Sequence, residues 1–469
     1  APVQKPSFGA EAADRSREKD KESLVPEKAD GTVTFWALDA DGDAEVNFAL
    51  PVHGGPSPDR NDVALAAGLQ PALAEALKRA PEFQPEQSAE ANRFSTFSMN
   101  VADVSFKLAQ ASLEAGQLPA PAQVRPEEFL NALDYRDPQP ASGLPVGFHW
   151  ERARHPLVHN RDVLRLSVQT AASGRGAGQP LNVVLLLDNS GSMERADRVR
   201  TLREGLQALA GQLKEGDVVS VVAFARTPRV WVDGLPGSRA AELPQQVGEL
   251  VPEGGTNLGD ALRVGYDVAR RHFLPNGGNH LVLLTDGAAN LGDVEPRNLV
   301  SLVTENRSRG IALSAFGVGW EGYNDALLEQ LSRNGDGRYG FMNTPEEARG
   351  EFASKLAGAL QVAAADVKVQ VEFNPARVRT WRQVGYAQHQ LTQEQFRDNT
   401  VDAAEIGAAE SGNALYFVET IPDGVGPIGQ VRVRYRVPET GAYEEHDWAV
   451  PYTGPAVPLE RGSPSLRLA

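Results

Sequence analysis

The middle of the chain contains short apolar runs that alternate with segments whose apolar residues recur every three or four positions. Residues 183–187 read Val-Val-Leu-Leu-Leu, without a polar position. An uninterrupted run of this length is typical of a strand that is buried on both faces, as in a parallel sheet covered by helices. The runs that we interpret as such strands are residues 183–187, 218–224, 280–284 and 311–318.

Helical patterns fill the intervals between these strands. After the first strand, leucines recur at helical spacing from Leu202 to Leu213. Thr344-Pro345-Glu346-Glu347 is a capping box with proline at the first helical position, and we expect it to open a helix that ends near Leu360. Strands that alternate with helices predict an α/β fold with a doubly wound, mostly parallel sheet. The predicted helices cover residues 199–213, 258–273, 297–307 and 345–360.

The flanks of this region alternate apolar and polar positions instead. Residues 163–169, 367–373 and 431–435 show this alternation, which is typical of strands with one face in water. Gly441 follows Pro438 in a segment that we interpret as a hairpin turn. We therefore expect antiparallel strands from both flanks to form one β-sandwich, into which the α/β domain is inserted. The expected parts are residues 91–179 (first flank), 180–362 (α/β domain), 363–455 (second flank) and 456–469 (a tail).

The first ninety residues differ in composition from the rest. Residues 1–30 are polar and carry both charges, and we interpret them as a disordered tail. Residues 31–90 form a small segment to which the pattern assigns no function. Within it, residues 32–38 predict a strand and residues 63–77 have an apolar helical pattern.

Three short polar segments stand beside the predicted strand ends. Asp188-Asn189-Ser190-Gly191-Ser192 follows the first apolar strand, and Thr285-Asp286-Gly287 follows the strand at 280–284. Gly254-Gly255-Thr256-Asn257 comes just before a predicted helix. In an open α/β sheet, ligands bind outside the carboxyl ends of the strands, where such loops converge. We therefore expect the three segments to form one site.

The side chains of these segments suit a hard cation. Mg²⁺ prefers oxygen ligands in near-octahedral geometry and usually keeps several waters. Carboxylates supply charge, and hydroxyls supply small neutral oxygens that pack closely around the ion. Because few ligands are anionic, the metal would stay electrophilic and could accept a carboxylate from a partner. We expect Gly191 and Gly255 to permit the tight turns that aim the hydroxyl groups inward.

The three segments, in this order, resemble the metal-ion-dependent adhesion site of the von Willebrand factor A family. That signature is Asp-x-Ser-x-Ser, then a distant Thr and a distant Asp, and Asp188, Ser190, Ser192, Thr256 and Asp286 match it. The resemblance implies that the serines and the threonine contact the metal directly, and the aspartates directly or through water. The ion would be Mg²⁺, with Mn²⁺ or Ca²⁺ as alternatives, and its open position would receive an acidic side chain of a protein partner. In some relatives the last helix of the domain slides when the site binds its ligand.

The resemblance extends into both flanks and covers roughly residues 91–451. Residues 92–101, Asn-Arg-Phe-Ser-Thr-Phe-Ser-Met-Asn-Val, are similar to a segment that precedes the A domain in a group of exported bacterial proteins. Residues 371–375 and 404–408 are similar to the C-terminal region of that group. This likeness implies an extracytoplasmic location, in the periplasm, on the cell envelope or secreted.

Composition restricts the partners. The chain has 469 residues, of which 62 are acidic and 46 basic, for a net charge of −16. This excess disfavours nucleic acid and anionic lipid as partners. The absence of cysteine excludes disulfides, thiolate metal sites and cysteine nucleophiles. No run approaches the ~18 apolar residues of a membrane helix. The chain begins at Ala1, which we interpret as a processed N-terminus, so an upstream signal or anchor stays open.

These observations favour a metal-dependent protein binder over an enzyme. A haloacid-dehalogenase-type phosphatase would need a second aspartate two residues after Asp188, and the chain has Ser190 there. Two alternatives stay open. One is an accessory subunit of an intracellular ATPase assembly, and the other is an A domain that binds no metal and acts as a scaffold.

Overall fold

The computed structural model describes residues 84–171, 179–286, 291–292, 295–319, 324–352, 362–438 and 440–469, and the backbone of residues 32–38 and 45–51. The chain divides into two compact parts, Ala1–Glu75 and Ala76–Ala469. In the first part, β1 (Thr32–Leu38) pairs antiparallel with β2 (Glu45–Pro51), which confirms the predicted strand. The tail predicted at residues 1–30 and the helical pattern at 63–77 lie outside the described residues.

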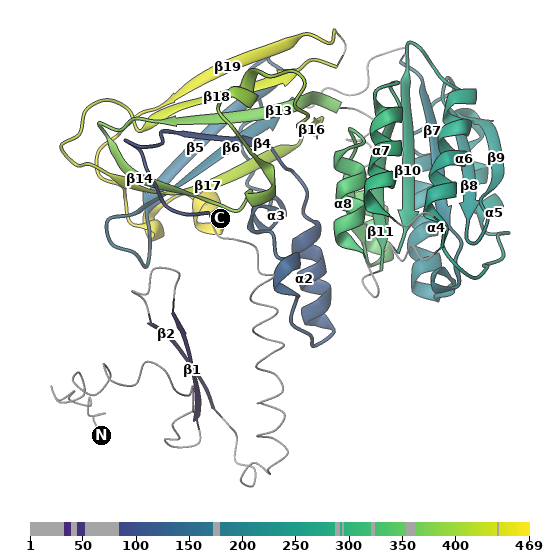
Figure 1. Cartoon of the computed structure of the whole chain (residues 1–469), viewed down its shortest axis with the longest axis horizontal. Helices are drawn as coiled ribbons and strands as arrows, with labels where there is room; N and C mark the ends of the chain where they lie inside the picture. The colour runs from purple at the N-terminus through teal and green to yellow at the C-terminus, as the bar shows by residue number, and fades with distance from the viewer. Residues whose placement is uncertain are drawn as a thin grey trace. The chain divides into compact units, whose positions relative to one another are not determined.

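The second part contains a six-stranded sheet with helices on both faces (Figure 1). Its strand order is β12-β11-β10-β7-β8-β9, and neighbours run parallel except β9, which is antiparallel to β8. This confirms the predicted doubly wound, mostly parallel sheet. The strands are β7 (Leu181–Asp188), β8 (Val218–Phe224), β9 (Arg229–Pro236), β10 (Gly278–Thr285), β11 (Ala312–Val318) and β12 (Tyr339–Met342). The helices are α4 (Ala196–Ala210), α5 (Leu243–Val247), α6 (Leu258–Arg271), α7 (Pro296–Arg307) and α8 (Asp325–Arg333), with 3-10 turns at Gly191–Glu194 and Gly237–Glu242.

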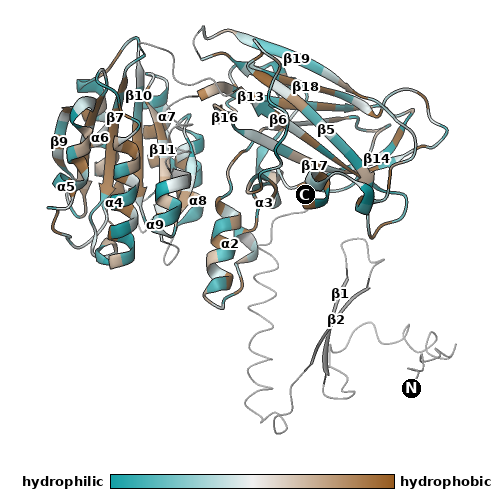
Figure 2. Ribbon diagram, turned by 180° about the vertical axis from the view of Figure 1, so that it is seen from behind, coloured by the Kyte–Doolittle hydropathy of each residue, from teal (hydrophilic) through white to brown (hydrophobic). Residues whose placement is uncertain are grey.

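The apolar run of β7 is continuous because the strand is covered on both faces. Successive side chains of a strand point to opposite faces of the sheet. Val184 and Leu186 pack with α6, α7 and α8, whereas Val183, Leu185 and Leu187 pack with α4 and α5. Figure 2 shows the result, with hydrophobic strands between helices whose outer faces are hydrophilic. A polar side chain at any of these positions would lose its hydration without a partner.

The flanks form two antiparallel sheets of one sandwich, as predicted (Figure 1). One sheet has the order β15-β4-β13-β18-β19, with β16 beside β13, and the other has the order β3-β14-β17-β6-β5. Val369 of the first sheet and Leu166 of the second belong to the same apolar core. The α/β domain is inserted between β6 and β13. The strands are β3 (Gln87–Ser88), β4 (Phe94–Ser98), β5 (Val146–Arg154), β6 (Asp162–Thr170), β13 (Val362–Phe373), β14 (Val378–Val384), β15 (Gln390–Leu391), β16 (Ala404–Gly407), β17 (Ser411–Thr420), β18 (Gly429–Arg436) and β19 (Tyr443–Val450).

Two helices of the first flank, α2 (Val104–Glu114) and α3 (Pro126–Asn131), attach the sandwich to the α/β domain. Val104 of α2 is fully buried in the same apolar cluster as α6, α7 and α8. Arg125, just before α3, donates hydrogen bonds to Asp325 Oδ2 of α8 at 2.5 Å and to Glu128 Oε1 at 2.6 Å. All three charged groups are buried, so this contact holds α3 against α8.

The segment after β12 begins as predicted. Thr344 Oγ1 accepts a hydrogen bond from the Glu347 amide at 3.2 Å, and Glu347 Oε2 accepts from the Thr344 amide, which confirms the capping box. The helix α9 (Pro345–Glu347) passes into a single π-helical turn, Ala348–Phe352. The predicted continuation to Leu360 lies outside the described residues.

Among the helices that the structure describes, none is long and apolar enough to cross a membrane. The remaining short helical turns are Pro121–Gln123, Ala387–His389, Glu394–Arg397, Leu459–Arg461 and α11 (Pro464–Leu468).

Candidate metal centre

The topology of the α/β sheet brings two carboxylates to one place. From β7 the chain continues to β8 on one side and later returns to β10 on the other, so β7 and β10 are neighbours at the topological switch point. Asp188 is the last residue of β7, and Asp286 follows the last residue of β10. Ligands of open α/β sheets bind outside the strand ends at such a point. The two aspartates therefore lie at the expected edge.

Asp188 is held in position by two hydrogen bonds. Its Oδ1 accepts from the Ser190 amide at 2.9 Å, and its Oδ2 accepts from the Thr285 hydroxyl at 2.6 Å. The residue is only 2% exposed. Burial, together with the charge of Asp286, raises the pKa of Asp188 to about 6, although the hydrogen bonds from Thr285 and Ser190 lower it. A cation beside Asp188 would favour its charged form.

The hydroxyl groups of Ser190 and Ser192 are hydrogen-bonded to each other, with their oxygens 3.0 Å apart. Adjacent ligands of an octahedral Mg²⁺ ion with bonds of about 2.0–2.1 Å are separated by about 2.9 Å. The spacing of these oxygens therefore fits two neighbouring corners of such an octahedron. Ser190 is buried and Ser192 is exposed, so the pair leads from the strand end toward solvent.

The loop with Thr256 reaches the same edge. The Glu253 amide donates to Asn189 O at 2.9 Å, and the Leu291 amide donates to Thr256 O at 3.1 Å. Thr256 itself is 2% exposed. These bonds connect the loop to the segment after β7 and to the segment after β10. The three predicted segments thus converge, although Gly287 lies outside the described residues.

The two glycines that we singled out differ in role. Gly255 has a φ of +87°, a conformation that a side chain would strain, so the tight turn predicted there is present. Gly191 is not in this region of backbone space, and a Cβ atom built on it would meet nothing within 4 Å. Gly191 begins the predicted turn, the 3-10 turn Gly191–Glu194, but that turn does not require a glycine at this position.

Arg198 is a charged residue of this centre that the sequence pattern did not indicate. It lies on α4 and donates to Asp286 Oδ2 at 2.6 Å and to Ser192 O at 3.1 Å. The side chains of Arg198 and Asp286 are 4% and 2% exposed. Such a pair is stable only because each charge compensates the other. In the sequence, Arg198 is one arginine among several on an amphipathic helix, and nothing local distinguishes it.

The donor set fits a hard cation that relies on hydroxyl oxygens. It offers two carboxylates and three hydroxyl groups, the oxygen chemistry that Mg²⁺ prefers. In the described part of the chain, no three His, Cys, Asp or Glu side chains are grouped so that they could hold a metal. A site built on Asp188, Asp286, Ser190, Ser192 and Thr256 has only two carboxylates, so this absence does not bear on it.

Family models match most of the described second part. Residues 182–356 match the model described as von Willebrand factor type A domain, and residues 77–165 match one described as von Willebrand factor. Residues 358–427 match the model for the C-terminal region of YfbK.

Individual proteins are similar to parts of the chain. The chain is 34% identical to YfbK of Escherichia coli over 339 residues, which are 71% of this chain and 59% of YfbK. It is 28% identical to inter-alpha-trypsin inhibitor heavy chain H4 of Sus scrofa over 164 residues, 34% of this chain and 18% of that protein. A solved von Willebrand factor type A structure from Catenulispora acidiphila aligns with a TM-score of 0.43 and 20% identity, covering 66% of this chain and 74% of the other. The chain thus spans 59% of the length of YfbK. The α/β domain inserted in the sandwich of this chain belongs to the von Willebrand factor A family.

Proposed function

We propose that this protein binds a protein partner through a divalent metal ion held by Asp188, Ser190, Ser192, Thr256 and Asp286. Von Willebrand factor A domains typically mediate protein interaction. The proposal adds that this interaction depends on a bound metal ion. The observation that carries it is that the hydrogen-bonded hydroxyl groups of Ser190 and Ser192 follow the strand end where the buried carboxylates of Asp188 and Asp286 lie. Because hydroxyl ligands are neutral, they add no negative charge around the metal ion. The ion could therefore still bind a third carboxylate, supplied by the partner.

When bound, the metal would supply an electrophilic position for a carboxylate of the partner. The residues of the chain have separate tasks. Thr285 holds Asp188 in one orientation through its 2.6 Å hydrogen bond, and Arg198 holds Asp286 in the same way. The burial of Asp188 keeps water away from its carboxylate, which strengthens its attraction for a cation, whereas Arg198 already neutralises the charge of Asp286. Ser192 is exposed, so a partner approaching along this edge reaches the site.

The alternatives are less well supported by the same geometry. Aspartyl-phosphate chemistry needs an acid/base group close to the nucleophile, and the position two residues after Asp188 carries the hydroxyl of Ser190. A metal-free scaffold and an accessory subunit of an ATPase assembly would both use the domain without the metal. We place the interaction outside the cytoplasm, on the basis of the cysteine-free composition and the flanking segments.

Calorimetric titration of chelator-stripped protein tests the proposal. Mg²⁺, Mn²⁺ and Ca²⁺ are titrated separately, with and without acetate to supply a free carboxylate. We expect saturable binding of about one ion by the unmodified protein and none by Asp188→Ala. Asp267→Ala is the matched control, because Asp267 lies exposed on α6 and should leave metal binding unchanged. Failure of all three ions to bind, even with acetate present, would overturn the metal mechanism and leave the scaffold alternative.

A further inference from the structure

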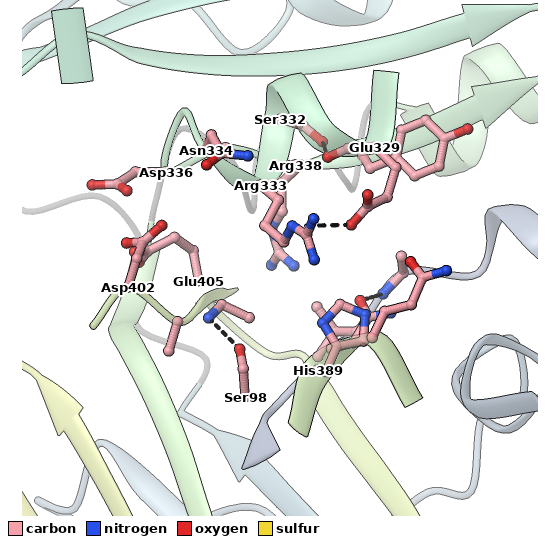
Figure 3. Close-up of a pocket in the computed structure, with 18 of the residues that line it drawn as sticks. Ser98, Glu329, Ser332, Arg333, Asn334, Asp336, Arg338, His389, Asp402 and Glu405 are labelled. Carbon is pink, nitrogen blue, oxygen red and sulfur yellow. Dashed lines mark hydrogen bonds and ion pairs between the residues drawn. The ribbon is translucent and has the colours of Figure 1, made fainter. Parts of the chain in front are cut away.

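A pocket of about 290 Å³ lies where the sandwich meets the α/β domain (Figure 3). One wall is formed by α8 and the turn at residues 334–338, and the other by residues 98–102, 388–391 and 402–405 of the flanks. The turn enters β12 at its amino end, so the pocket is at the edge of the sheet opposite Asp188. Its volume is near the lower limit of small-molecule sites, roughly 300 Å³. A ligand here would be small.

The pocket has more acidic than basic groups. Its lining includes two basic side chains, Arg333 and Arg338, against six acidic ones. His389 also lines it, but burial lowers the pKa of His389 to about 3, so the imidazole adds no positive charge at neutral pH. The acidic side chains are Glu128, Glu329, Asp336, Asp402, Glu405 and Glu410.

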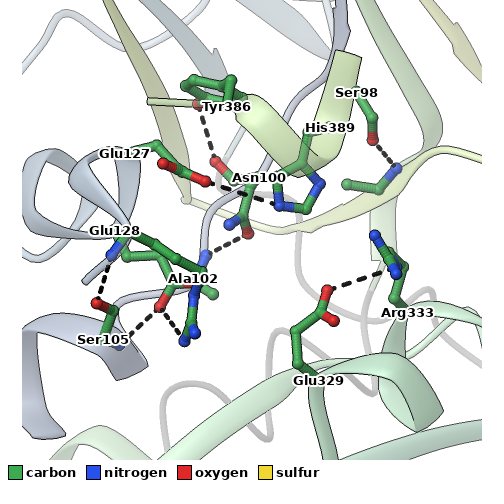
Figure 4. Close-up of polar contacts among 12 residues, drawn as sticks. Ser98, Asn100, Ala102, Ser105, Glu127, Glu128, Glu329, Arg333, Tyr386 and His389 are labelled. Atoms are coloured by element: carbon green, nitrogen blue, oxygen red, sulfur yellow. Dashed lines mark hydrogen bonds and ion pairs between the residues drawn. The ribbon is translucent and has the colours of Figure 1, made fainter. Parts of the chain in front are cut away.

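Most of these carboxylates have an ionic partner within the protein. Glu329 pairs with Arg333 at 3.4 Å, as Figure 4 shows, and Glu410 pairs with Arg338. Arg307 of α7 pairs with Asp402 and also with Asp336, and Arg436 lies 3.9 Å from Asp336 and pairs with Asp366, so two guanidinium groups serve three carboxylates. On the side of the pocket where residues 402–405 lie, there are therefore fewer basic than acidic side chains, and not every carboxyl group has its own cationic partner.

The surroundings of Glu405 are a second reason to expect a ligand, independent of the number of acidic and basic groups. It is 6% exposed, and the structure gives it no salt bridge with any described residue. Its Oε1 accepts from the Asp366 amide at 3.3 Å, whereas its Oε2 has no hydrogen-bond partner in the described part of the chain. Burial raises the pKa of Glu405 well above its usual value, the charges of Asp336 and Asp366 add to this, and the charge of Arg436 lowers it. Glu405 is therefore protonated in the absence of a ligand and becomes a charged partner when a cation binds beside it. A buried carboxyl oxygen without a partner costs free energy unless something binds it.

The arrangement favours an organic cation over a metal ion. No three acidic or histidine side chains among the described residues converge so that they could hold a metal. An ammonium or guanidinium group on a short chain has several N–H donors at different places, and it can reach carboxyl groups that no single ion would contact. Val101, Leu391 and Ala404 also line the pocket and provide apolar surface for the chain.

We propose that this pocket binds a small organic cation, an ammonium or guanidinium group on a short aliphatic chain, with Asp402 and Glu405 as its counter-ions. Such a ligand contacts Asp336 of the α/β domain and Glu405 of the sandwich at once. It therefore holds the two against each other. The site does not depend on the metal centre, because it is formed by residues at the other edge of the sheet.

Calorimetric titration of the full chain with agmatine, which carries a guanidinium and an ammonium on a four-carbon chain, tests the proposal. We expect saturable binding that weakens by at least about tenfold in Glu405→Gln and in Asp402→Asn. Asp402 has a side chain exposed by 31%, so its replacement should leave the fold intact even if the buried Glu405 variant misfolds. Asp447→Asn, on β19, is the control with the same change of charge at a distance, and it should bind agmatine as the unmodified protein does.

Two further probes decide the chemistry and the source of the ligand. Arg338 Nε also lacks an acceptor among the described residues, so succinate tests whether the pocket prefers an anion. Succinate binding as tight as agmatine binding would overturn the proposal, as would agmatine binding that both carboxyl variants leave unchanged or no saturable binding up to millimolar concentration. The tripeptide Gly-Arg-Gly tests a protein side chain as the source, and its binding in place of agmatine would assign the site to a partner's arginine. Asp188→Ala should bind agmatine normally, which separates this site from the metal centre.

Discussion

Arg198 Nη1 lies 2.6 Å from Asp286 Oδ2, which joins the helix after β7 to the carboxylate after β10. The guanidinium thus stands beside the group that we propose as a metal ligand. Groups that hold a metal ligand in place typically change metal affinity by about 10- to 100-fold when they are removed. The pair also stabilises the metal-free protein, because it neutralises a buried charge.

Replacing Arg198 by Met should therefore act most strongly on the metal-free protein. Without the guanidinium, the buried Asp286 carboxylate loses its ion pair with Arg198, and we expect a loss of about 3–5 kcal/mol in the free energy of unfolding. Saturating Mg²⁺ would compensate part of this charge, so the rise of the melting temperature on adding Mg²⁺ should be larger in the variant. Thermal unfolding with and without Mg²⁺ measures both effects. Arg200→Met, on the exposed side of the same helix, is the control, and an equal Mg²⁺ effect in both variants would contradict the prediction.

Thr285→Val removes the hydroxyl that orients Asp188 while keeping the shape of the side chain. The Asp188 carboxylate loses a 2.6 Å hydrogen bond, and we expect the dissociation constant for Mg²⁺ to rise about tenfold. Calorimetric titration measures this change. Thr304→Val removes a similar hydroxyl from α7, where it bonds only the Val300 carbonyl at 2.9 Å, and should not affect Mg²⁺ binding. If both variants bind Mg²⁺ equally well, Thr285 does not position the ligand.

The stability of the junction should depend on the ionisation of Asp402. Burial and the charge of Asp336 raise its pKa to about 7, well above the ~3.9 of an unfolded chain. A carboxyl group whose pKa is raised by folding contributes its full stability below the unfolded pKa and loses it as the pH rises through the folded pKa. Asp402→Asn removes this dependence. We expect the variant to melt above the unmodified protein at pH 8.5, and the difference to shrink as the pH falls below 7 and to disappear only below about pH 4. A difference that stays constant over this range would contradict the assignment.

Arg165 should be the most sensitive charged residue of the sandwich. It is 1% exposed, donates to Asp137 Oδ1 at 2.5 Å and to Glu151 Oε2 at 2.9 Å, and lies over the Tyr135 ring at 4.3 Å. Arg165→Met leaves both carboxylates without their partner, and we expect a loss of about 3–5 kcal/mol in urea-induced unfolding. Arg165→Lys should not restore it, because an ammonium cannot make the paired contacts of a guanidinium.

Arg93→Met is the matched control for that experiment. Arg93 is 55% exposed and lies 3.8 Å from Glu372, and such surface pairs contribute about 1 kcal/mol or less. Similar losses in the two variants would show that the Arg165 contacts contribute no more than a surface pair.

The fold and the position of the metal centre follow from local patterns. The apolar runs predicted the strands β7, β8, β10 and β11 because their side chains are buried on both faces. The edge strands β9 and β12 were not predicted, since β9 is largely exposed and β12 has only four residues. Likewise, Asp188 and Asp286 lie at the ends of strands whose apolar runs can be recognised in the sequence. Arg198, in contrast, reaches Asp286 only through the packing of α4.

Contacts between distant segments were beyond the sequence. Arg125 and Asp325 are 200 positions apart, and neither residue is unusual in its local context. The same holds for the pocket at the junction, which combines residues near 98, 336, 389 and 405. Periodicity reports only which face of an element is buried, so it cannot identify the partner that covers that face.

The insertion of the α/β domain sets the order in which the chain can fold during synthesis. Ser95 of β4 and Tyr416 of β17 are hydrogen-bonded at 3.0 Å but lie 321 positions apart. At roughly 5–20 residues per second, a ribosome needs tens of seconds to make that interval. During this time β4, β5 and β6 have no β13 or β17 to pair with, and their edges and apolar faces are open to other nascent chains. The α/β domain has all its strands within one continuous segment, so it can fold first and hold the early strands close to the place where their partners emerge.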